Sequence, residues 1–224
     1  TNGIQNTLVG ALAGDLMTTG DANTFIGFQA ATNGVVTGDD NTAVGKSAGY
    51  SLTTGSNNLL LGHDSGLTGS PGGNINSESN RVCLGDENIT HIYAQVQTIS
   101  SSDERDKTDF TALDLGLDFV KALAPVTYKW DKRAKYGDKY ADDYDFNAQT
   151  PDGTHKEDWL DIGFKAQSVV ALEEAAGYTI SDKTNLVSSL TEDGKQYGLQ
   201  YENFIPILVK AIQELTARLE TLEG

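Results

Sequence analysis

A serine and a lysine lie five positions apart near the middle of this 224-residue chain, in the stretch Ser102-Asp103-Glu104-Arg105-Asp106-Lys107. A serine hydroxyl attacks a peptide carbonyl when a neighbouring base removes its proton. A lysine serves as that base only where burial lowers its pKa enough to make it neutral. If the bond before Ser102 is the one that breaks, the hydroxyl attacks the carbonyl of Ser101 through a five-membered ring. The stretch therefore permits self-cleavage, with Ser102 as nucleophile and Lys107 as base.

The same residues also suit the start of a helix. A serine followed by acidic residues is typical of an N-cap, and spacing alone favours that role for Ser102. Three consecutive serines, at positions 100–102, leave the scissile bond open by one residue. Ser102 is preferred because it precedes Asp103 and stands five residues before Lys107. Ser101, Asp103 and Arg105 are the expected supporting residues near the site.

The composition of the chain changes at this stretch. Residues 1–101 hold sixteen of the 24 glycines and carry eight acidic and two basic residues, whereas the remainder carries 24 and 14. The net charge of −16 leaves neither half with the basic surface that nucleic-acid binding requires. No apolar run approaches the roughly 20 residues that span a bilayer, so we expect no membrane insertion. The start at Thr1 favours a fragment of a longer protein.

We expect no metal and no cofactor. The three histidines, His63, His91 and His155, are isolated in the sequence and show no ligand spacing. Asp143-x-Asp145-x-Asn147 begins like a calcium loop, but it lacks the glycine and the glutamate that such a loop needs.

A five-residue unit recurs in the first hundred residues, an asparagine and a short apolar run closed by glycine. It occurs at residues 6–10, 23–27, 41–45 and 58–62, with a degenerate copy at 81–85. Such periodicity predicts an all-β repeat shaft over residues 1–99. We expect a trimeric β-helix or β-prism in which identical chains supply missing faces, and a self-contained parallel β-helix is the alternative. The match of residues 45–49 to a hydrolase nucleophile elbow is read as a repeat turn, because the preceding repeat has no serine there.

Residues 100–224 predict an α+β domain. The pattern favours helices at 113–123 and 166–176, strands at 126–130, 162–164, 185–187 and 197–199, and a final helix at about 202–223. In that helix, apolar residues alternate at spacings of three and four, as in a coiled-coil seam. The seam residues are Ile205, Leu208, Ile212, Leu215, Leu219 and Leu222. The alternative is a single amphipathic helix packed on its own domain.

Four stretches in the second half carry a family resemblance. They are Ser102-Asp103-x-Arg105-x-Lys107-Thr108-Asp109, residues 125–130 (PVTYKW), residues 163–167 (GFKAQ) and residues 197–201 (YGLQY). In this order they resemble the peptidase S74 family, the C-terminal intramolecular chaperone domains of phage tailspikes and tail fibres. The resemblance implies that the domain aligns three chains and then cleaves itself off through a Ser-Lys dyad. Ser102 falls on the nucleophile of that dyad, and Lys107 falls on the base.

The repeats of the first half resemble those of phage tail fibres. Together the two halves predict the C-terminal part of a homotrimeric virion tail fibre, assembled in the host cytoplasm and acting outside the cell. Its shaft would bind a host surface receptor, a glycan or an outer-membrane component. The main alternative is a structural adhesin whose C-terminal trimerisation clamp stays attached. A polysaccharide-degrading tailspike would need a carboxylate pair in the first half, and the spacing reveals none.

Overall fold

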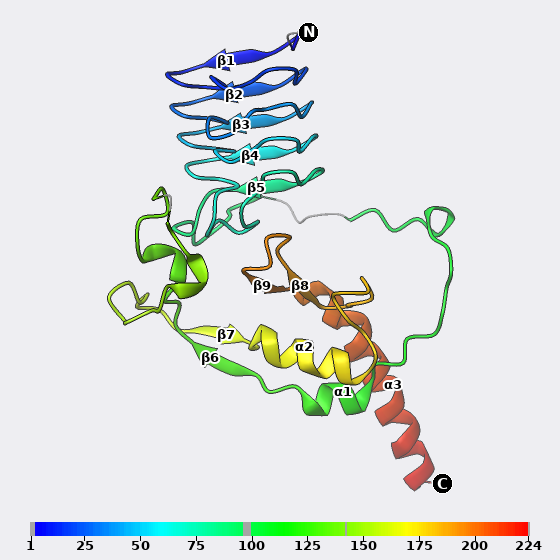
Figure 1. Cartoon of the computed structure of the whole chain (residues 1–224). Coiled ribbons are helices and arrows are strands. Elements are labelled where there is room, and N and C mark those ends of the chain that lie inside the picture. Colours follow the sequence, from blue (N-terminus) through cyan, green and yellow to red (C-terminus); the bar gives the residue numbers. More distant parts are fainter. Residues whose placement is uncertain (1–2, 96–99, 142, 224) are drawn as a thin grey trace. The chain divides into compact units, whose positions relative to one another are not determined.

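The computed structural model describes residues 3–95, 100–141 and 143–223, which form two compact units (Figure 1). The first unit comprises Thr1–His91, Lys129–Trp159 and Thr191–Gln196, and the second comprises Ile92–Tyr128, Leu160–Leu190 and Tyr197–Gly224. The predicted boundary between residues 99 and 100 adjoins positions 96–99, which lie outside the described residues.

The repeats of the first unit form a parallel β-solenoid. Each apolar triplet is one short strand: β1 (Thr7–Val9), β2 (Thr24–Ile26), β3 (Thr42–Val44), β4 (Leu59–Leu61) and β5 (Val82–Leu84). The strands pair in chain order, so each repeat makes one turn and equivalent residues stack. This register explains why the sequence repeats with a nearly constant period.

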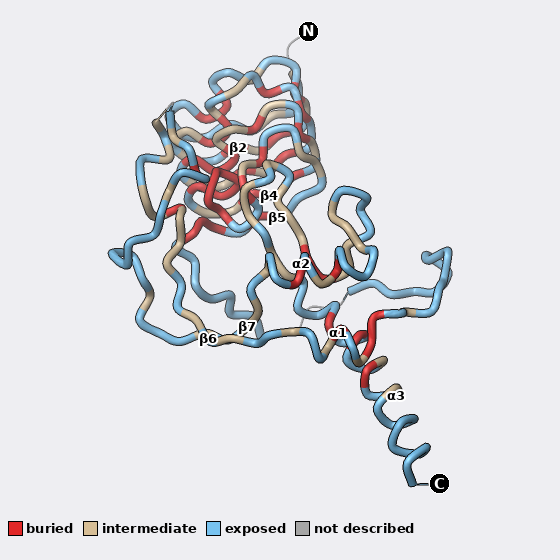
Figure 2. Tube along the Cα trace, turned by 60° about the horizontal axis from the view of Figure 1, so that its bottom comes forward, coloured by how far each residue is buried: buried red, intermediate tan, exposed pale blue. Residues whose placement is uncertain are grey.

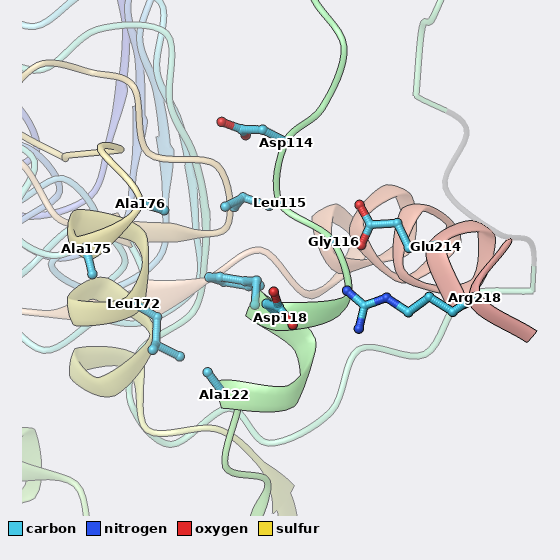
Figure 3. Close-up of a pocket in the computed structure, with 11 residues that line it drawn as sticks. Asp114, Leu115, Gly116, Asp118, Ala122, Leu172, Ala175, Ala176, Glu214 and Arg218 are labelled. Atoms are coloured by element: carbon cyan, nitrogen blue, oxygen red, sulfur yellow. The ribbon is translucent and has the colours of Figure 1, made fainter. Parts of the chain in front are cut away.

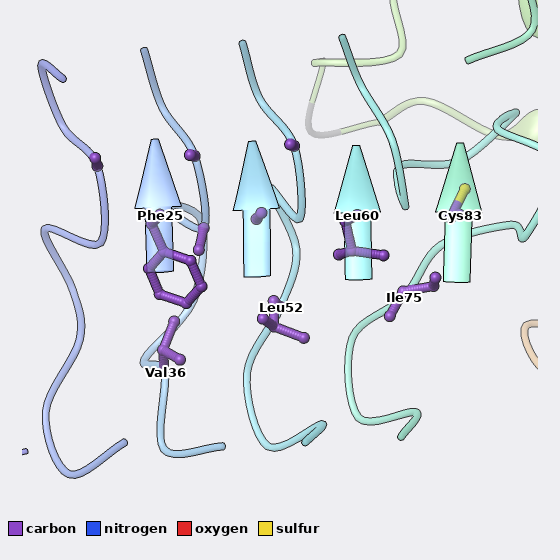
Figure 4. Packing of buried hydrophobic residues seen from close by; sticks show 11 residues of the cluster. Phe25, Val36, Leu52, Leu60, Ile75 and Cys83 are labelled. Carbon is purple, nitrogen blue, oxygen red and sulfur yellow. The ribbon is translucent and has the colours of Figure 1, made fainter. Parts of the chain in front are cut away.

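A single chain builds the solenoid core. The middle residues of β2 to β5 point inward and are buried: Phe25, Ala43, Leu60 and Cys83. Val36, Leu52 and Ile75 close the same core from the loops (Figure 4). The core thus needs no faces from other copies, contrary to the expectation that identical chains would supply them. The self-contained parallel β-helix is the fold, because alanines and serines at fixed positions let the loops approach closely.

The asparagine of each repeat holds successive turns together. The side-chain oxygens of Asn6, Asn23 and Asn41 each accept the backbone N–H of the next repeat's asparagine, at 2.8, 2.9 and 3.1 Å. Asn58 accepts from the N–H of Arg81 in the same way, at 3.0 Å. Because a buried amide needs partners for both its oxygen and its nitrogen, the side-chain N–H groups also donate to backbone carbonyls. This ladder is the physical basis of the recurring asparagine.

The glycine that closes each strand is required by space and by backbone conformation. Gly27 and Gly45 both have φ +138°, where side chains are strained. A Cβ on Gly27 would lie 2.3 Å from the carbonyl oxygen of Gly45, and one on Gly45 would lie 2.5 Å from that of Gly62. Any larger residue would therefore separate the turns.

The described residues of the second unit form two small antiparallel sheets and three helices. Strand β6 (Val126–Tyr128) pairs with β7 (Asp161–Gly163), and β8 (Ser188–Leu190) pairs with β9 (Tyr197–Leu199). The helices are α1 (Leu117–Ala122), α2 (Ala166–Ala175) and α3 (Phe204–Glu223), with short 3-10 turns η1 (Glu104–Asp106) and η4 (Tyr201–Asn203). Their core consists of Leu115, Phe119, Val169, Val187, Phe204 and Ile207.

Helix α1 is shorter than the predicted helix at 113–123. It begins at Leu117, whose backbone N–H donates to the Glu214 carboxylate of α3 at 2.8 Å. A Cβ on Gly116 would lie 2.5 Å from the same carboxylate, so a larger residue there would displace the Glu214 side chain. The apolar stripe at Leu113 and Leu115 still packs on the core, but without helical backbone.

Helix α3 has two apolar faces. Phe204, Ile207 and Ala211 are buried and pack it on its own unit. The predicted seam is a different stripe and is exposed, as in Ile212 at 63% and Leu222 at 83% (Figure 2). Packing on its own domain therefore leaves the seam uncovered.

A buried glutamate in α2 fixes the segment that follows it. Glu173 is 1% exposed, and its carboxylate accepts the backbone N–H groups of Leu186 and Val187 at 2.7 and 2.8 Å. It also accepts the N–H of Ser188 at 3.0 Å. Three backbone donors just before and within β8 thus depend on one buried side chain.

Glu173→Gln should lower the free energy of unfolding by about 1–3 kcal/mol. The substitution replaces one accepting oxygen by an NH2 group, which cannot accept a hydrogen bond from a backbone N–H. Urea unfolding followed by circular dichroism measures the change. Glu174→Gln is the matched control, since Glu174 is exposed. Equal stability of the two variants would contradict the anchoring role.

Candidate active site

The structure brings Ser102 and Lys107 together. The Lys107 Nζ donates a hydrogen bond to the Ser102 Oγ at 2.6 Å. The turn η1 makes this approach: the Asp106 N–H donates to the Asp103 carbonyl at 3.2 Å, and the Lys107 N–H donates to the Glu104 carbonyl at 3.1 Å. The chain thus reverses within five residues and returns the lysine to the serine.

Ser102 is not the helix cap that spacing alone favours. The N-cap of η1 is Asp103, whose side chain accepts the Arg105 N–H at 3.0 Å. The Arg105 guanidinium also pairs with the Asp103 carboxylate, at 3.0 Å from Nε and 2.6 Å from the terminal nitrogen. These bonds hold the pKa of Asp103 below its ordinary value. Arg105 thus engages the nearest carboxylate, while the ammonium of Lys107 contacts the serine.

Solvent surrounds the pair. Ser102, Lys107 and their neighbours from residue 100 to residue 112 are exposed. In a hydrogen bond to a serine oxygen, a solvated ammonium is the donor, so it cannot also remove the hydroxyl proton. The geometry of a dyad is therefore present, and the burial that would make the lysine a base is not.

A separate pocket of about 440 Å³ lies among α1, α2 and α3 (Figure 3). Asp118, Leu172, Glu214 and Arg218 are among its lining residues, and neither Ser102 nor Lys107 is. The dyad therefore does not face this pocket.

The comparisons with known proteins give one match. Residues 102–178 match the family model described as chaperone of endosialidase, peptidase S74. This segment, 77 of the 224 residues, is similar to the chaperone-of-endosialidase family. The family is associated with self-cleaving intramolecular chaperones and with phages. No curated protein and no solved structure matches the chain.

The matched segment begins at Ser102 itself. It therefore contains both dyad residues, α1, α2 and the first antiparallel sheet, whereas α3 lies beyond it. Within the described part of the chain, no helix is long and apolar enough to cross a membrane.

A second polar cluster in the first unit joins the solenoid to the chaperone segment. After the closing glycine of each turn, the next two residues stack on their equivalents in the following turn. In the last two turns these pairs are His63-Asp64 and Asp86-Glu87. Accordingly, the His63 Nδ1 lies 3.0 Å from the Asp86 carboxylate. His63 is thus not isolated, because the stacking of turns places a residue 23 positions away beside it.

Lys139 of the chaperone segment pairs with two carboxylates of this cluster. Its Nζ lies 2.7 Å from the Asp64 carboxylate and 3.0 Å from that of Glu87, which are 1% and 7% exposed. Burial alone would lower the pKa of Lys139, but hydrogen bonds to Asp64 and Glu87 raise it above its ordinary value. For the Asp86 carboxyl, burial acts in the opposite direction and would raise the pKa, but hydrogen bonds from His63 and Asn88 lower it below its ordinary value. All three carboxylates are therefore held near cationic or hydrogen-bonding partners.

His63, Asp64 and Asp86 also offer ligand atoms within 4.8 Å of one another, as a metal site would. The ammonium of Lys139 already lies against Asp64, so the structure assigns no metal here. Aligning the residues after each closing glycine could have found this cluster in the sequence. Only the last two turns have acidic residues there.

Tyr140, next to Lys139, gives this cluster a pH dependence. Its hydroxyl donates to the Asp64 carboxylate, and burial together with this bond raises its pKa to about 12. Lys46 also lies 5.8 Å from the ring centroid. A raised pKa means that the folded state favours the protonated phenol. The stabilisation is therefore complete below pH 10 and is lost as the pH rises toward about 12.

The difference in free energy of unfolding between wild type and Tyr140→Phe should therefore be constant from pH 8 to pH 10 and should shrink above pH 10. Urea unfolding of both proteins at pH 8, 10 and 11 measures it, with Ser102→Ala in both to keep the chain in one piece. A difference that stays constant through pH 11 would contradict the assignment.

Proposed function

We propose that the chain is the C-terminal part of a trimeric phage tail fibre. Its chaperone domain aligns three copies of the solenoid shaft and then cuts its covalent link to the shaft by autoproteolysis before Ser102. The observation that carries the proposal is the 2.6 Å hydrogen bond between Lys107 and Ser102, in a family match that begins at Ser102. The agreement between the start of the family match and the serine favours the bond between Ser101 and Ser102.

The reaction needs only residues of this chain and water. A neutral Lys107 takes the hydroxyl proton, and the Ser102 Oγ attacks the carbonyl carbon of Ser101. The carbon–nitrogen bond breaks, the Ser102 nitrogen takes the proton from Lys107, and an ester joins Ser101 to the Ser102 oxygen. Water then hydrolyses the ester and leaves a carboxylate on Ser101 and a free hydroxyl and amine on Ser102.

Trimerisation explains how Lys107 becomes neutral. A lysine that is exposed in one chain becomes a base only if something removes it from water. The exposed seam of α3 supplies the means, because leucine and isoleucine at coiled-coil spacing associate with copies of themselves. We infer that association covers the dyad, so that cleavage follows assembly.

The shaft would provide the host-binding part. Its β-solenoid presents stacked loops, and such a surface suits a cell-surface glycan or an outer-membrane component. Localisation in a virion tail fibre, with assembly in the host cytoplasm, follows from the same proposal.

A permanently attached trimerisation clamp is the second candidate. The exposure of Ser102 and Lys107 favours it, because a solvated lysine does not activate a serine. One measurement distinguishes the two functions. It is the size of the purified chain under denaturing conditions.

We expect wild type to give two fragments on a denaturing gel, the second of them beginning at Ser102. Ser102→Ala and Lys107→Ala should each remain whole, because each removes one member of the dyad. N-terminal sequencing or intact mass identifies the new end. Ser100→Ala and Ser101→Ala are the matched controls and should still be cut. Cleavage that persists in both dyad variants would exclude this mechanism.

Leu215→Glu should reduce the mass measured by light scattering from three chains to one, because it places a charge in the seam of α3. Gln213→Glu adds the same charge at an exposed position outside the seam and should leave the trimer intact. If Leu215→Glu is still a trimer, the seam is not the assembly surface.

A further inference from the structure

We propose that the two pieces remain bound after cleavage, through an interface between the last turns of the solenoid and two parts of the C-terminal piece. The inference rests on the proposed cleavage before Ser102. Those two parts are residues 129–140, here called the basic finger, and residues 191–196, here called the hairpin tip. Both belong to the same compact unit as the shaft, although both lie beyond the scissile bond.

The charge of the finger complements that of the shaft. The finger holds four lysines, one arginine and two aspartates in twelve residues, whereas residues 1–101 hold eight acidic and two basic residues. Most of the charge contacts occur at the last two turns. There Lys139 bridges the stacked carboxylates of Asp64 and Glu87, and the Lys132 Nζ donates to the Glu87 carbonyl at 2.8 Å. The occupant that this acidic end accepts is therefore a lysine-bearing segment.

Shape complementarity supports the same contact. A Cβ on Gly69 would lie 2.4 Å from the Cβ of Ala134 in the finger, so the two backbones meet with no room to spare. Tyr140 packs edge-on against Tyr50, with ring centroids 5.8 Å apart. An interface with this fit resembles the close packing of a protein interior more than a loose surface contact.

The hairpin tip makes a second, independent contact. The Asn74 N–H donates to the Asp193 carboxylate at 3.2 Å, and the Gln196 side chain donates to the Ser70 carbonyl at 3.3 Å. Arg81 pairs with Glu192 at the exposed rim. The shaft is therefore held at two places that cleavage does not touch.

Undocking has a specific electrostatic cost. If the finger leaves, Asp64 and Glu87 remain stacked on successive turns without the ammonium that bridges them. If Lys139 is replaced while the finger stays docked, the two carboxylates stay buried without their cation, which is strongly unfavourable. Cleavage alone therefore does not release the chaperone piece, and Lys139 controls its release.

The test uses the full chain with an affinity tag at its N-terminus. After cleavage, capture at neutral pH should retain the C-terminal piece, visible as two bands when the eluate is denatured. Lys139→Met should weaken retention roughly 100-fold, as judged from the concentration at which the pieces separate on dilution. Lys156→Met is the matched control, because Lys156 is an exposed lysine of the same unit. It should retain the piece like wild type.

A second form of the chain separates this inference from the proposed cleavage. In Ser102→Ala, a recognition sequence for a site-specific protease is inserted between the exposed residues Phe110 and Thr111. The added protease then cuts the chain whether or not the dyad is active. Retention after this cut supports the interface even if wild type never cleaves itself. Free separation of the cut pieces at neutral pH and low salt would overturn it.

A rescue variant tests whether charge is the cause. Lys139→Met with Glu87→Gln removes the cation together with one acid, and should recover part of the lost retention. If the double variant is no better than Lys139→Met alone, the lysine acts through packing, and the electrostatic account of release is wrong.

Discussion

The stacking of equivalent residues in a parallel, in-register solenoid is the constraint on which the shaft depends. It places the asparagines in a ladder, the inward residues in one continuous core and the closing glycines against one another. The same regularity has a cost, because near-identical turns pair almost as well when they are shifted by one repeat. After the closing glycine, only the last two turns carry acidic residues, in His63-Asp64 and Asp86-Glu87. The information that fixes register therefore lies next to the segment that the chaperone domain supplies.

The pair Ser102 and Lys107 shows a second constraint, which is that a lysine acts as a base only after it is removed from water. A tight turn is enough to bring Lys107 within 2.6 Å of Ser102, and five residues encode that turn. Desolvation is not local, since no short exposed stretch can exclude solvent from its own side chains. Under the proposed mechanism, a dyad that is correctly placed and still solvated stays inactive until another surface covers it. In this way the requirement for burial can order events, with assembly first and bond cleavage second.

Features encoded by neighbouring residues could be predicted from the sequence, and features that depend on distant partners could not. The apolar triplets are strands, and the predicted helices near 166–176 and 202–223 are α2 and α3. The start of α1 differs because Glu214, far along the chain, caps Leu117. The role of Glu173 cannot be read from its own helix, since the backbone N–H groups that donate to its carboxylate belong to β8 and to the residues just before it. From the sequence, closure of the solenoid by one chain is only the alternative, because small core residues resemble an incomplete core.

The buried Lys139 makes sense as a recognition device more than as a source of stability. Well-packed apolar residues often stabilise as much as a buried ion pair, whereas a pair with one member missing is severely penalised. Earlier turns have Leu12, Gln29 and Ser47 where the fourth turn has Asp64, so a finger docked one turn too early would place its ammonium between Ser47 and Asp64 and lose one of its two carboxylates. The penalty thus falls on the misaligned states and spares the aligned one. Backbone hydrogen bonds alone would give nearly the same docking energy at every repeat. The ion pair at this position makes the docking energy differ between repeats.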